Sequence, residues 1–343
     1  MRGNALRSVA DRFDARKAER TECGPRGEAI SLEPRPKDYD VVIVGGGPAG
    51  LSAAAFCGKK FLRTAVFEGK CWGGILTRHC PDKRIDNYPG VPKGILAEEL
   101  AALLVEQAHG AGADLIDLGV EEIAPDGTVR AKDLETAGKV LILACGSNAG
   151  EAGIPGEKEF AGRGVHYRVH DPSRFRGMRV VVVGGGDTAI SHVHRLLGAA
   201  VRVTFVHRKP HLRSVEGLSA EALQSGNLEV LLGTAVEEIL GAARVEGVRL
   251  RQGTEAGTRD LPADAVIVAA GRVPNTALFG NVGLGLDPEG RIATDEWQRT
   301  SVPRILAIGD VSSPLKMIIT AVGQAAVAAH EAYEQVRSPY WKK

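Results

Sequence analysis

A glycine-rich stretch near the start of the chain constrains the fold more than any other feature. Residues 39–51 read Y-D-V-V-I-V-G-G-G-P-A-G-L, an apolar run that leads into a glycine turn and then into a helix-forming segment. This order predicts a strand, a phosphate-binding loop, and a helix whose N-terminus offers N–H donors and the positive end of its dipole. In such a loop Gly45 allows the tight turn, Gly47 the close approach of a pyrophosphate, and Gly50 the close packing of helix on strand.

The residues that follow favour a nucleotide site over a glycine turn without a ligand. Residues 65–68 read A-V-F-E, which predicts a second strand ending in an acid. An acid about 20 residues after the glycines is placed to bind a ribose hydroxyl. We therefore assign that role to Glu68.

Composition sets limits on the kind of protein. The chain has 343 residues, of which 44% are hydrophobic, and a formal charge of +1, so we expect two domains with full cores and no nucleic acid as main partner. Without a long apolar run or a signal peptide, a cytoplasmic location is expected. Five cysteines do not form the framework of a secreted protein, so a disulfide here would be catalytic or redox-sensing. No metal site is expected.

The N-terminal residues 1–37 are polar and rich in arginine and glutamate, which predicts a mobile arm outside the fold. An alternative is a short amphipathic helix, because Leu6, Val9, Ala10 and Phe13 occur at helical spacing between arginines. Such a helix would make a weak contact with a membrane surface or a partner.

A second unit of the same kind begins near residue 180, where four valines lead into G-G-G-D-T-A. Its second predicted strand, residues 201–206, ends in basic residues instead of an acid. Arginine binds a 2′-phosphate that a carboxylate would repel, so this unit suits NADP better than NAD; the alternative is a solvated basic turn. The candidate nucleotide-binding residues here are Gly184, Gly186, Asp187, Thr188, His207, Arg208, Lys209 and Arg213.

The order of motifs resembles that of the low-molecular-weight thioredoxin reductases. G-G-G-P-A-G, an acid, G-G, N-Y-P-G, G-G-G-D-T-A, H-R-K, A-A-G-R-V-P-N and I-G-D follow one another across nearly all of residues 38–336. The resemblance implies an α/β fold with two Rossmann-like domains of the ββα type, the second inserted into the first, and a homodimer. It implies a discontinuous FAD-binding domain of residues 38–152 and 276–337, and an NADPH-like domain of residues 153–275.

The resemblance also implies which residues hold FAD. They lie in the first glycine loop, in the loop after the acid, in the last strand and at the start of the last helix. Asp310 can accept hydrogen bonds from polyol hydroxyls, and the N-terminus of the last helix can stabilise negative charge on a bound ring. The implied residues are Gly45, Gly47, Pro48, Ala49, Gly50, Glu68, Gly74, Leu76, Thr77, Asn87, Val120, Gly309, Asp310, Ile318 and Ile319.

Two departures from this family bear on function. Thioredoxin reductases carry C-x-x-C before the second glycine motif, whereas residues 165–171 read V-H-Y-R-V-H-D. That segment resembles the thioredoxin-reductase-like ferredoxin or flavodoxin–NADP reductases, in which an aromatic ring stacks on the isoalloxazine at the position of Cys80. Ser191 and His192 stand where the family usually has a carboxylate, which favours a second FAD over NADPH as the nucleotide of the second unit.

Cys71 and Cys80 lie on either side of a double glycine in the loop expected around the flavin. We expect them to form a reversible disulfide that exchanges electrons with FAD, because Lys70, Arg78 and His79 would lower a thiol pKa there. This combination resembles the diflavin-linked disulfide oxidoreductases, which carry a second FAD where the others bind NADPH. The alternative is two unrelated small residues, since spacing alone fixes no disulfide geometry.

Three functions follow from these patterns. The first is an FAD-dependent disulfide oxidoreductase that uses Cys71 and Cys80 and acts with a redox protein or a small dithiol. The second is a ferredoxin or flavodoxin–NADP reductase, in which Cys80 only packs on the ring. The third is a flavin-binding sensor without turnover. Of the other cysteines, Cys57 and Cys145 are expected to be small buried residues, and Cys23 lies in the arm.

Overall fold

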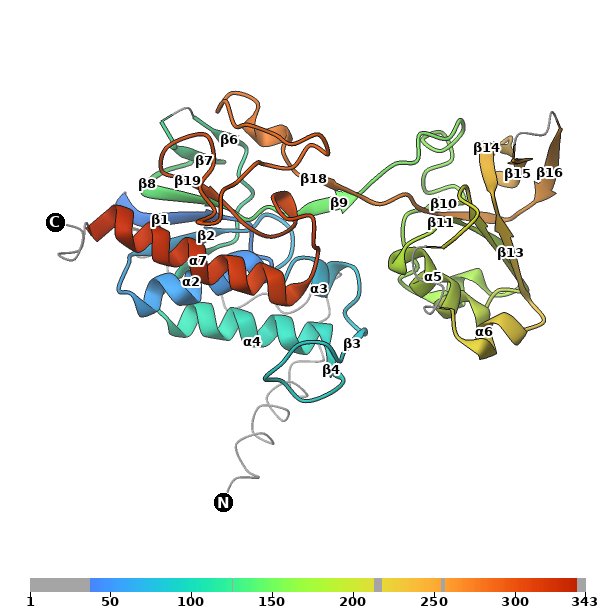
Figure 1. Ribbon diagram of the computed structural model, residues 1–343, viewed down its shortest axis with the longest axis horizontal. Helices are drawn as coiled ribbons and strands as arrows, with labels where there is room; N and C mark the ends of the chain where they lie inside the picture. The colour runs from blue at the N-terminus through green and yellow to red at the C-terminus, as the bar shows by residue number, and fades with distance from the viewer. Residues whose placement is uncertain (1–37, 125, 213–217, 254–256, 338–343) are drawn as a thin grey trace, which may run out of the picture. The chain divides into compact units, whose positions relative to one another are not determined.

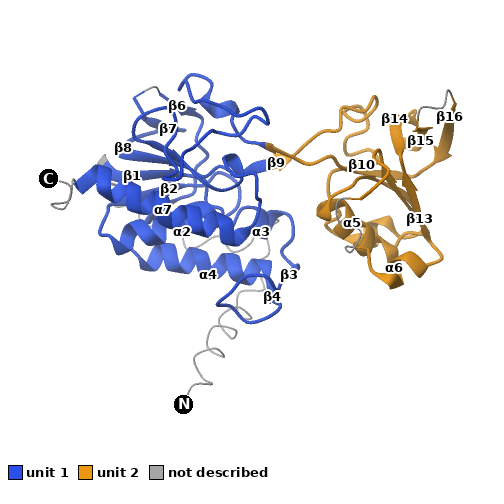
Figure 2. Cartoon of the chain, in the orientation of Figure 1, with its two compact units in different colours: residues 1–147, 274–343 blue, residues 148–273 orange. Residues whose placement is uncertain are grey.

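The computed structural model describes residues 38–124, 126–212, 218–253 and 257–337, so the predicted N-terminal arm lies outside the described residues. The chain forms two compact units (Figure 2). Unit 1 comprises Met1–Ser147 and Pro274–Lys343, and unit 2 comprises Asn148–Val273.

The chain passes from unit 1 to unit 2 after Ser147 and returns after Val273. Both crossings come earlier in the sequence than the expected ones, after residues 152 and 275. The two crossings fall within β9 (Ser147–Ala149) and β18 (Arg272–Pro274), which pair with each other. Their pairing sets the boundary, and no turn signal in the sequence marks it.

Unit 1 is built on a seven-stranded sheet in the order β5-β2-β1-β8-β7-β6, with β19 also paired to β8 (Figure 1). Strands β1, β2, β5, β8 and β19 run parallel, and β6 and β7 extend the sheet in antiparallel fashion. The strands are β1 (Asp38–Val44), β2 (Thr64–Phe67), β5 (Asp114–Ile116), β6 (Glu122–Ile123), β7 (Val129–Ala131), β8 (Leu134–Leu143) and β19 (Ile305–Ala307).

Both faces of this sheet are covered, as its continuous apolar strands require. On one face Val41 and Ile43 of β1 pack against the helices α2 (Pro48–Lys59), α4 (Ala97–Gly110) and α7 (Ile318–Arg337). On the other face Val42 and Val44 pack with residues from β6, β7 and the segment that contains η3 (Ala277–Phe279). Contacts of α2 with α4 and α7 hold the three helices side by side (Figure 1).

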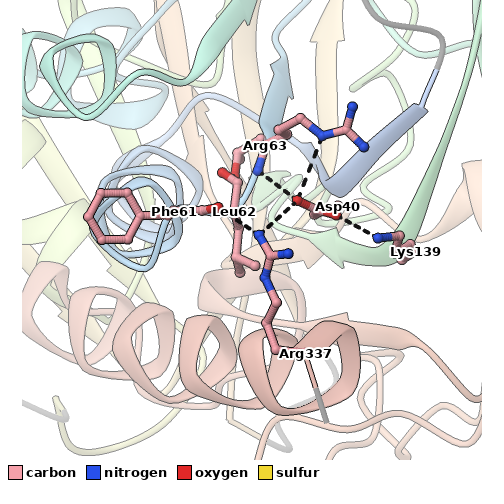
Figure 3. A network of polar contacts seen from close by, with 7 residues as sticks. Asp40, Phe61, Leu62, Arg63, Lys139 and Arg337 are labelled. Carbon is pink, nitrogen blue, oxygen red and sulfur yellow. Dashed lines mark hydrogen bonds and ion pairs between the residues drawn. The ribbon is translucent and has the colours of Figure 1, made fainter. Parts of the chain in front are cut away.

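A buried carboxylate joins the end of α7 to the start of the sheet (Figure 3). The Asp40 side chain is only 3% exposed and accepts hydrogen bonds from Lys139 Nζ at 2.9 Å and from the Arg63 backbone N–H at 3.0 Å. Arg337 Nη2 lies 3.6 Å from Asp40 Oδ2 and donates to the Phe61 carbonyl at 2.9 Å. The last described residue of α7 is thus tied to β1 and to the chain that enters β2.

Unit 2 combines a parallel sheet with an antiparallel one. The parallel sheet has the order β10-β17-β11-β12-β13, and α5 packs against it. Its elements are β10 (Val165–His166), η1 (Pro172–Phe175), β11 (Arg179–Gly184), α5 (Asp187–Leu197), β12 (Arg202–His207), α6 (Ala220–Gln224), β13 (Leu228–Leu232) and β17 (Ala265–Ala269). The predicted α/β class is confirmed in both units.

The antiparallel sheet of unit 2 consists of β14 (Thr234–Gly241), β15 (Val245–Gln252) and β16 (Thr258–Pro262), and the sequence analysis did not predict it. Its apolar residues Ile239, Val248 and Leu250 pack in one cluster with Val181 of the parallel sheet. The alternation of apolar and polar residues in β15 is interrupted, which weakens the strand signal.

The segment between β2 and α4 contains short regular elements. Helix α4 begins at Ala97, because Ile95 and Leu96 form β4, which pairs with β3 (Arg84–Ile85). The Glu99 side chain accepts a hydrogen bond from Leu96 N at 2.8 Å and so caps the helix. The loop itself contains a short helix, α3 (Ile75–Arg78). Within the described ranges, no helix has the length and apolar character needed to cross a bilayer.

Candidate functional site

The first glycine loop has the backbone geometry of a phosphate-binding turn. Gly45 has φ 112°, and a Cβ there would lie 2.3 Å from the Ala144 carbonyl oxygen. A Cβ at Gly50 would lie 1.9 Å from the Gly45 carbonyl oxygen. At Gly47 the nearest atom to an added Cβ is the Gly74 Cα, 4.0 Å away. The first and third glycines are therefore required by close packing, while the outer side of Gly47 has room for a phosphate, as FAD needs.

The carboxylate of Glu68 is fixed at this loop by backbone donors. Its Oε2 accepts from Gly46 N at 2.8 Å, and its Oε1 accepts from Lys70 N at 2.8 Å and Cys71 N at 3.2 Å. The ring of Trp72 packs against Gly46 from the same side. A carboxylate held by three N–H groups keeps lone pairs for further donors, so Glu68 could still accept a hydrogen bond from a ribose hydroxyl, and that role stays a prediction.

Two further glycines from distant parts of the chain converge on the loop. A Cβ at Gly74, which has φ 57°, would lie 3.0 Å from the Gly47 Cα. A Cβ at Gly309 would lie 2.9 Å from the Ala49 Cβ in α2. The structure thus brings Gly74 and the start of η4 (Gly309–Val311) to the first turn of α2, as an FAD site requires.

The remaining FAD candidates divide into two groups. Asp310 Oδ2 accepts from Ser147 Oγ at 2.8 Å, and the Thr77 hydroxyl lies 2.8 Å from the Trp72 carbonyl oxygen. Those two side chains are therefore oriented by neighbours within unit 1. For the other candidates the assignment rests on the resemblance alone: the buried Leu76, the exposed Asn87 and Ile319, and the half-buried Pro48, Val120 and Ile318.

The expected disulfide between Cys71 and Cys80 is wrong for this structure. Cys71 takes part in a disulfide, whereas Cys80 is a thiol that donates to the Ile75 carbonyl oxygen at 3.6 Å. The reason is α3, which the sequence analysis did not predict and which lies between the two cysteines. The turn that ends α3 directs the Cys80 thiol back towards the first residue of the helix.

The other two described cysteines, Cys57 and Cys145, are also thiols. Cys23, the remaining cysteine of the sequence, lies outside the described residues. Burial raises the pKa of Cys57 to about 12 and that of Cys145 to about 12. Cys145 donates to the Asn275 carbonyl at 3.3 Å, and Asn275 Nδ2 donates back to the Cys145 carbonyl at 2.7 Å. Neither thiol is a candidate nucleophile at neutral pH.

The glycine loop of unit 2 repeats the geometry of unit 1. A Cβ at Gly184 would lie 2.6 Å from the Ala269 carbonyl oxygen and 3.0 Å from the Ala189 Cβ, so Ala189 takes the place of a third glycine. Nothing lies within 4 Å of a Cβ built at Gly186. Asp187 and Thr188, both exposed, form the first turn of α5. Unit 2 therefore also has room for a phosphate at its loop.

At the end of β12 an imidazole takes the position that Glu68 has in unit 1. The His207 ring packs against Gly185, whose Cβ would lie 2.1 Å from His207 Cε1. Burial lowers the pKa of His207 below its usual value; hydrogen bonds with the backbone of Gly184 and His211 oppose this shift, and the charges of Lys209 and Arg208 add to it. The neutral form of the ring therefore predominates at pH 7. Arg208 and Lys209 are exposed beside it, while the fourth predicted basic residue, Arg213, lies outside the described residues. No carboxylate occupies this position to repel a 2′-phosphate.

Residues 165–171 contain no cysteine, and histidine and arginine side chains take the place of the C-x-x-C pair. His192 of α5 is 8% exposed, and neither of its ring nitrogens has a hydrogen-bond partner in the described part of the chain. Burial lowers the pKa of His192 to about 4, and the charges of Arg195, Arg168 and His170 act in the same direction. In the sequence His192 stands out only as a departure from the family, because the positive environment around it depends on segments that meet only in the fold.

Comparison with known proteins places this geometry in context. Residues 39–332 match the family model described as pyridine nucleotide-disulphide oxidoreductase. The chain is 35% identical to a thioredoxin reductase of Listeria monocytogenes, over 88% of this chain and 94% of that protein. It is also 35% identical to a ferredoxin–NADP reductase of Thermus thermophilus, over 85% of this chain and 91% of that protein. The crystal structure of Lactococcus lactis thioredoxin reductase superposes with a TM-score of 0.81 and 31% identity, covering 88% of this chain and 100% of that one.

Proposed function

Because the chain belongs to the pyridine nucleotide-disulphide oxidoreductase family, we propose that it transfers electrons between a nicotinamide nucleotide bound by unit 2 and a separate electron carrier, by way of FAD bound in unit 1. The chain is a flavin-dependent oxidoreductase of the thioredoxin-reductase-like type. Bound FAD supplies the chemistry that links two-electron hydride donors to other acceptors. The chain's own residues bind and orient the FAD.

The observation that carries this proposal is the lack of a cysteine pair in residues 165–171. An enzyme that reduces a disulfide substrate through its own dithiol needs two cysteines within disulfide distance. Among the described residues Cys80 is a thiol held by the Ile75 carbonyl, and burial raises the pKa values of Cys57 and Cys145. Cys71 takes part in a disulfide, but none of these three thiols pairs with it. The proposed route therefore runs directly from the flavin to the carrier, with the Cys71 disulfide outside it.

A one-electron carrier protein of the ferredoxin or flavodoxin class is the acceptor that fits this route. The Thermus thermophilus relative, named a ferredoxin–NADP reductase, supports this assignment. Relatives named thioredoxin reductase point to thioredoxin as partner, but direct transfer to thioredoxin through C-x-x-C has no counterpart in residues 165–171.

A second FAD in unit 2 is the competing proposal for the nucleotide. Ser191 and His192, which replace the usual carboxylate, favour it because they leave a nicotinamide without that acceptor. NADPH is favoured by Arg208 and Lys209, which are exposed beside the neutral His207 at the end of β12. Both FAD and NADPH carry a pyrophosphate, so the free space beside Gly186 does not distinguish between them.

The experiment combines a count of flavins with a reduction assay. The protein is denatured and the released flavin is identified and counted per chain. The native protein is then mixed anaerobically with NADPH or NADH, and flavin bleaching is followed. One FAD per chain with faster bleaching by NADPH supports the leading proposal. Two FADs per chain and no bleaching by either nucleotide would replace it with the competing one.

A further inference from the structure

The middle glycine of the first loop, Gly46, is explained neither by its backbone conformation nor by room for a phosphate. Gly45 has φ 112°, whereas Gly46 does not adopt a positive φ. A Cβ at Gly46 would lie 2.5 Å from Trp72 Cε3, 2.7 Å from Trp72 Cζ3 and 2.8 Å from Glu68 Cβ. Carbon atoms pack at about 3.5–4.0 Å. The indole ring of Trp72 therefore occupies the space that any larger residue at position 46 would need.

The indole ring of Trp72 and the stem of the Glu68 side chain are neighbours, because both contact Gly46 on the side where a Cβ would project. Gly46 is buried and donates its N–H to Glu68 Oε2 at 2.8 Å. An aromatic ring packed beside a backbone N–H keeps water away from it, and a hydrogen bond in such a dry environment is stronger than one in water. Trp72 therefore stabilises the observed position of the Glu68 carboxylate.

The backbone around Trp72 is bonded to the same loop. Gly73 N donates to the Gly46 carbonyl oxygen at 2.8 Å, and the Thr77 hydroxyl donates to the Trp72 carbonyl oxygen at 2.8 Å. The half-buried indole ring also packs against the apolar cluster that contains residues of α2 and α4. Gly46 thus has its N–H bound to Glu68, its carbonyl bound to Gly73 and its Cα covered by Trp72.

We propose that Trp72 is a positioning residue for FAD, whose indole ring holds the Glu68 carboxylate in the orientation that binds the ribose of the adenosine. Trp72 is not among the residues that the family resemblance implies for FAD. Its role rests on the proposed binding of FAD in unit 1 and on the predicted contact of Glu68 with the ribose. The preference of the site for a ribose hydroxyl then depends on a side chain that acts on Glu68 through packing.

The test compares two ligands that differ by one hydroxyl group, FAD and its analogue with 2′-deoxyadenosine. The flavin-loaded full chain is exchanged against an excess of either ligand, and the dissociation constant is measured by ultrafiltration over a dilution series. In wild type the analogue should bind about tenfold more weakly than FAD, because it lacks the hydroxyl that would donate to the Glu68 carboxylate.

Trp72→Leu should weaken FAD binding about tenfold and leave binding of the analogue unchanged, so that the preference for FAD disappears. Trp72→Phe keeps an aromatic face and should retain most of the preference. Trp297→Leu is the control, since Trp297 is 41% exposed in the same unit, and it should change neither dissociation constant. Equal weakening of both ligands in Trp72→Leu would mean that the ring is only structural, and an unchanged preference would mean that it does not position Glu68; either result overturns the proposal.

Gly46→Ala disturbs the same contact from the opposite side, because the new Cβ would occupy the space of the ring. It should also lose the preference, and adding Trp72→Leu should have little further effect, since both changes act on one contact. A Gly46→Ala protein with the wild-type preference would contradict the role of Trp72, even if Trp72→Leu did not fold.

The wild-type measurement separates this role from the proposed function. Equal binding of FAD and the analogue by wild type would overturn the role of Trp72 and leave FAD binding, and with it the proposed function, in place. A wild-type chain that binds neither ligand would overturn both.

Discussion

The ring of His207 packs against the backbone of Gly185, with His207 Cε1 only 2.1 Å from where a Cβ would lie. In unit 1 the equivalent contact is made by an acid, because Glu68 Oε2 accepts from Gly46 N at 2.8 Å. The two nucleotide units therefore share one loop geometry and differ in the charge at the end of the second strand. A neutral imidazole beside Arg208 would not repel a 2′-phosphate, whereas a carboxylate such as that of Glu68 would.

We predict that Arg208→Ala weakens NADP⁺ binding about tenfold and leaves NAD⁺ binding unchanged, because only the 2′-phosphate is lost as a partner. Calorimetric titration of both nucleotides measures this. The matched control is Arg202→Ala at the start of β12, whose guanidinium pairs with Glu229 at 2.9 Å. Equal losses for NADP⁺ and NAD⁺, or none for either, would mean that Arg208 is only a solvated basic residue.

The open side of Gly47 provides a test of the FAD site. A glutamate there would occupy the space for the pyrophosphate and repel it, so Gly47→Glu should purify colourless. Gly186→Glu makes the same change in unit 2 and should keep one FAD per chain. Flavin absorbance relative to protein is the measurement. A yellow Gly47→Glu protein with full FAD content would contradict this placement of the cofactor.

The buried Asp40 predicts acid-sensitive stability. Burial alone would raise the pKa of Asp40, but the hydrogen bonds from Lys139 and Arg63 and the charges of Lys139 and Arg337 lower it below its usual value. A lowered pKa in the folded state stabilises the protein above pH about 4, and this stabilisation disappears as the pH falls through the folded-state pKa.

Asp40→Asn should therefore lower the free energy of unfolding by about 2 kcal/mol at neutral pH, and by less in acid. Urea unfolding of the flavin-loaded protein, at neutral pH and again in acid, measures the difference in the free energy of unfolding between Asp40→Asn and wild type. Asp133→Asn, a change of an exposed acid in the same unit, serves as control. Equal midpoints for Asp40→Asn and wild type at neutral pH would show that the network in Figure 3 adds nothing to stability.

The reactivity of the cysteines distinguishes this structure from one with a disulfide between Cys71 and Cys80. Native protein should alkylate at Cys80 well before Cys57 or Cys145, because burial raises the pKa values of the latter two to about 12. Peptide mapping of the alkylated, unreduced protein identifies the labelled sites. A recovered peptide pair linked through Cys71 and Cys80 would contradict the structure and restore the disulfide mechanism.

Much of the fold could be predicted because its strongest signals are local. The strand, loop and helix around Gly45 and around Gly184 follow directly from the order of apolar and glycine residues. The membership of the family and the flavin-dependent chemistry, predicted from the order of these motifs, are confirmed by the relatives. The second FAD, the dimer and the location in the cell remain predictions.

The errors arose where geometry depends on a short turn or on contacts between distant segments. The four-residue α3 decides where the Cys80 thiol points, yet a helix of that length has almost no periodic signal. His192 and Arg168 are 24 positions apart by their numbers, and only the packing of α5 on the segment after β10 brings their charges together. Spacing in the sequence carries no information on either feature.

The central claim is that electrons leave the flavin without a dithiol of this chain. Anaerobic titration with dithionite, normalised to released FAD, tests it most directly, because a flavin and a disulfide each take up two electrons. The account predicts about two electrons per FAD at full bleaching, the same in Cys80→Ser as in wild type. About four electrons per FAD in wild type would show a redox-active disulfide in the relay and contradict the account, and a fall to about two in Cys80→Ser would identify Cys80 as one of its members.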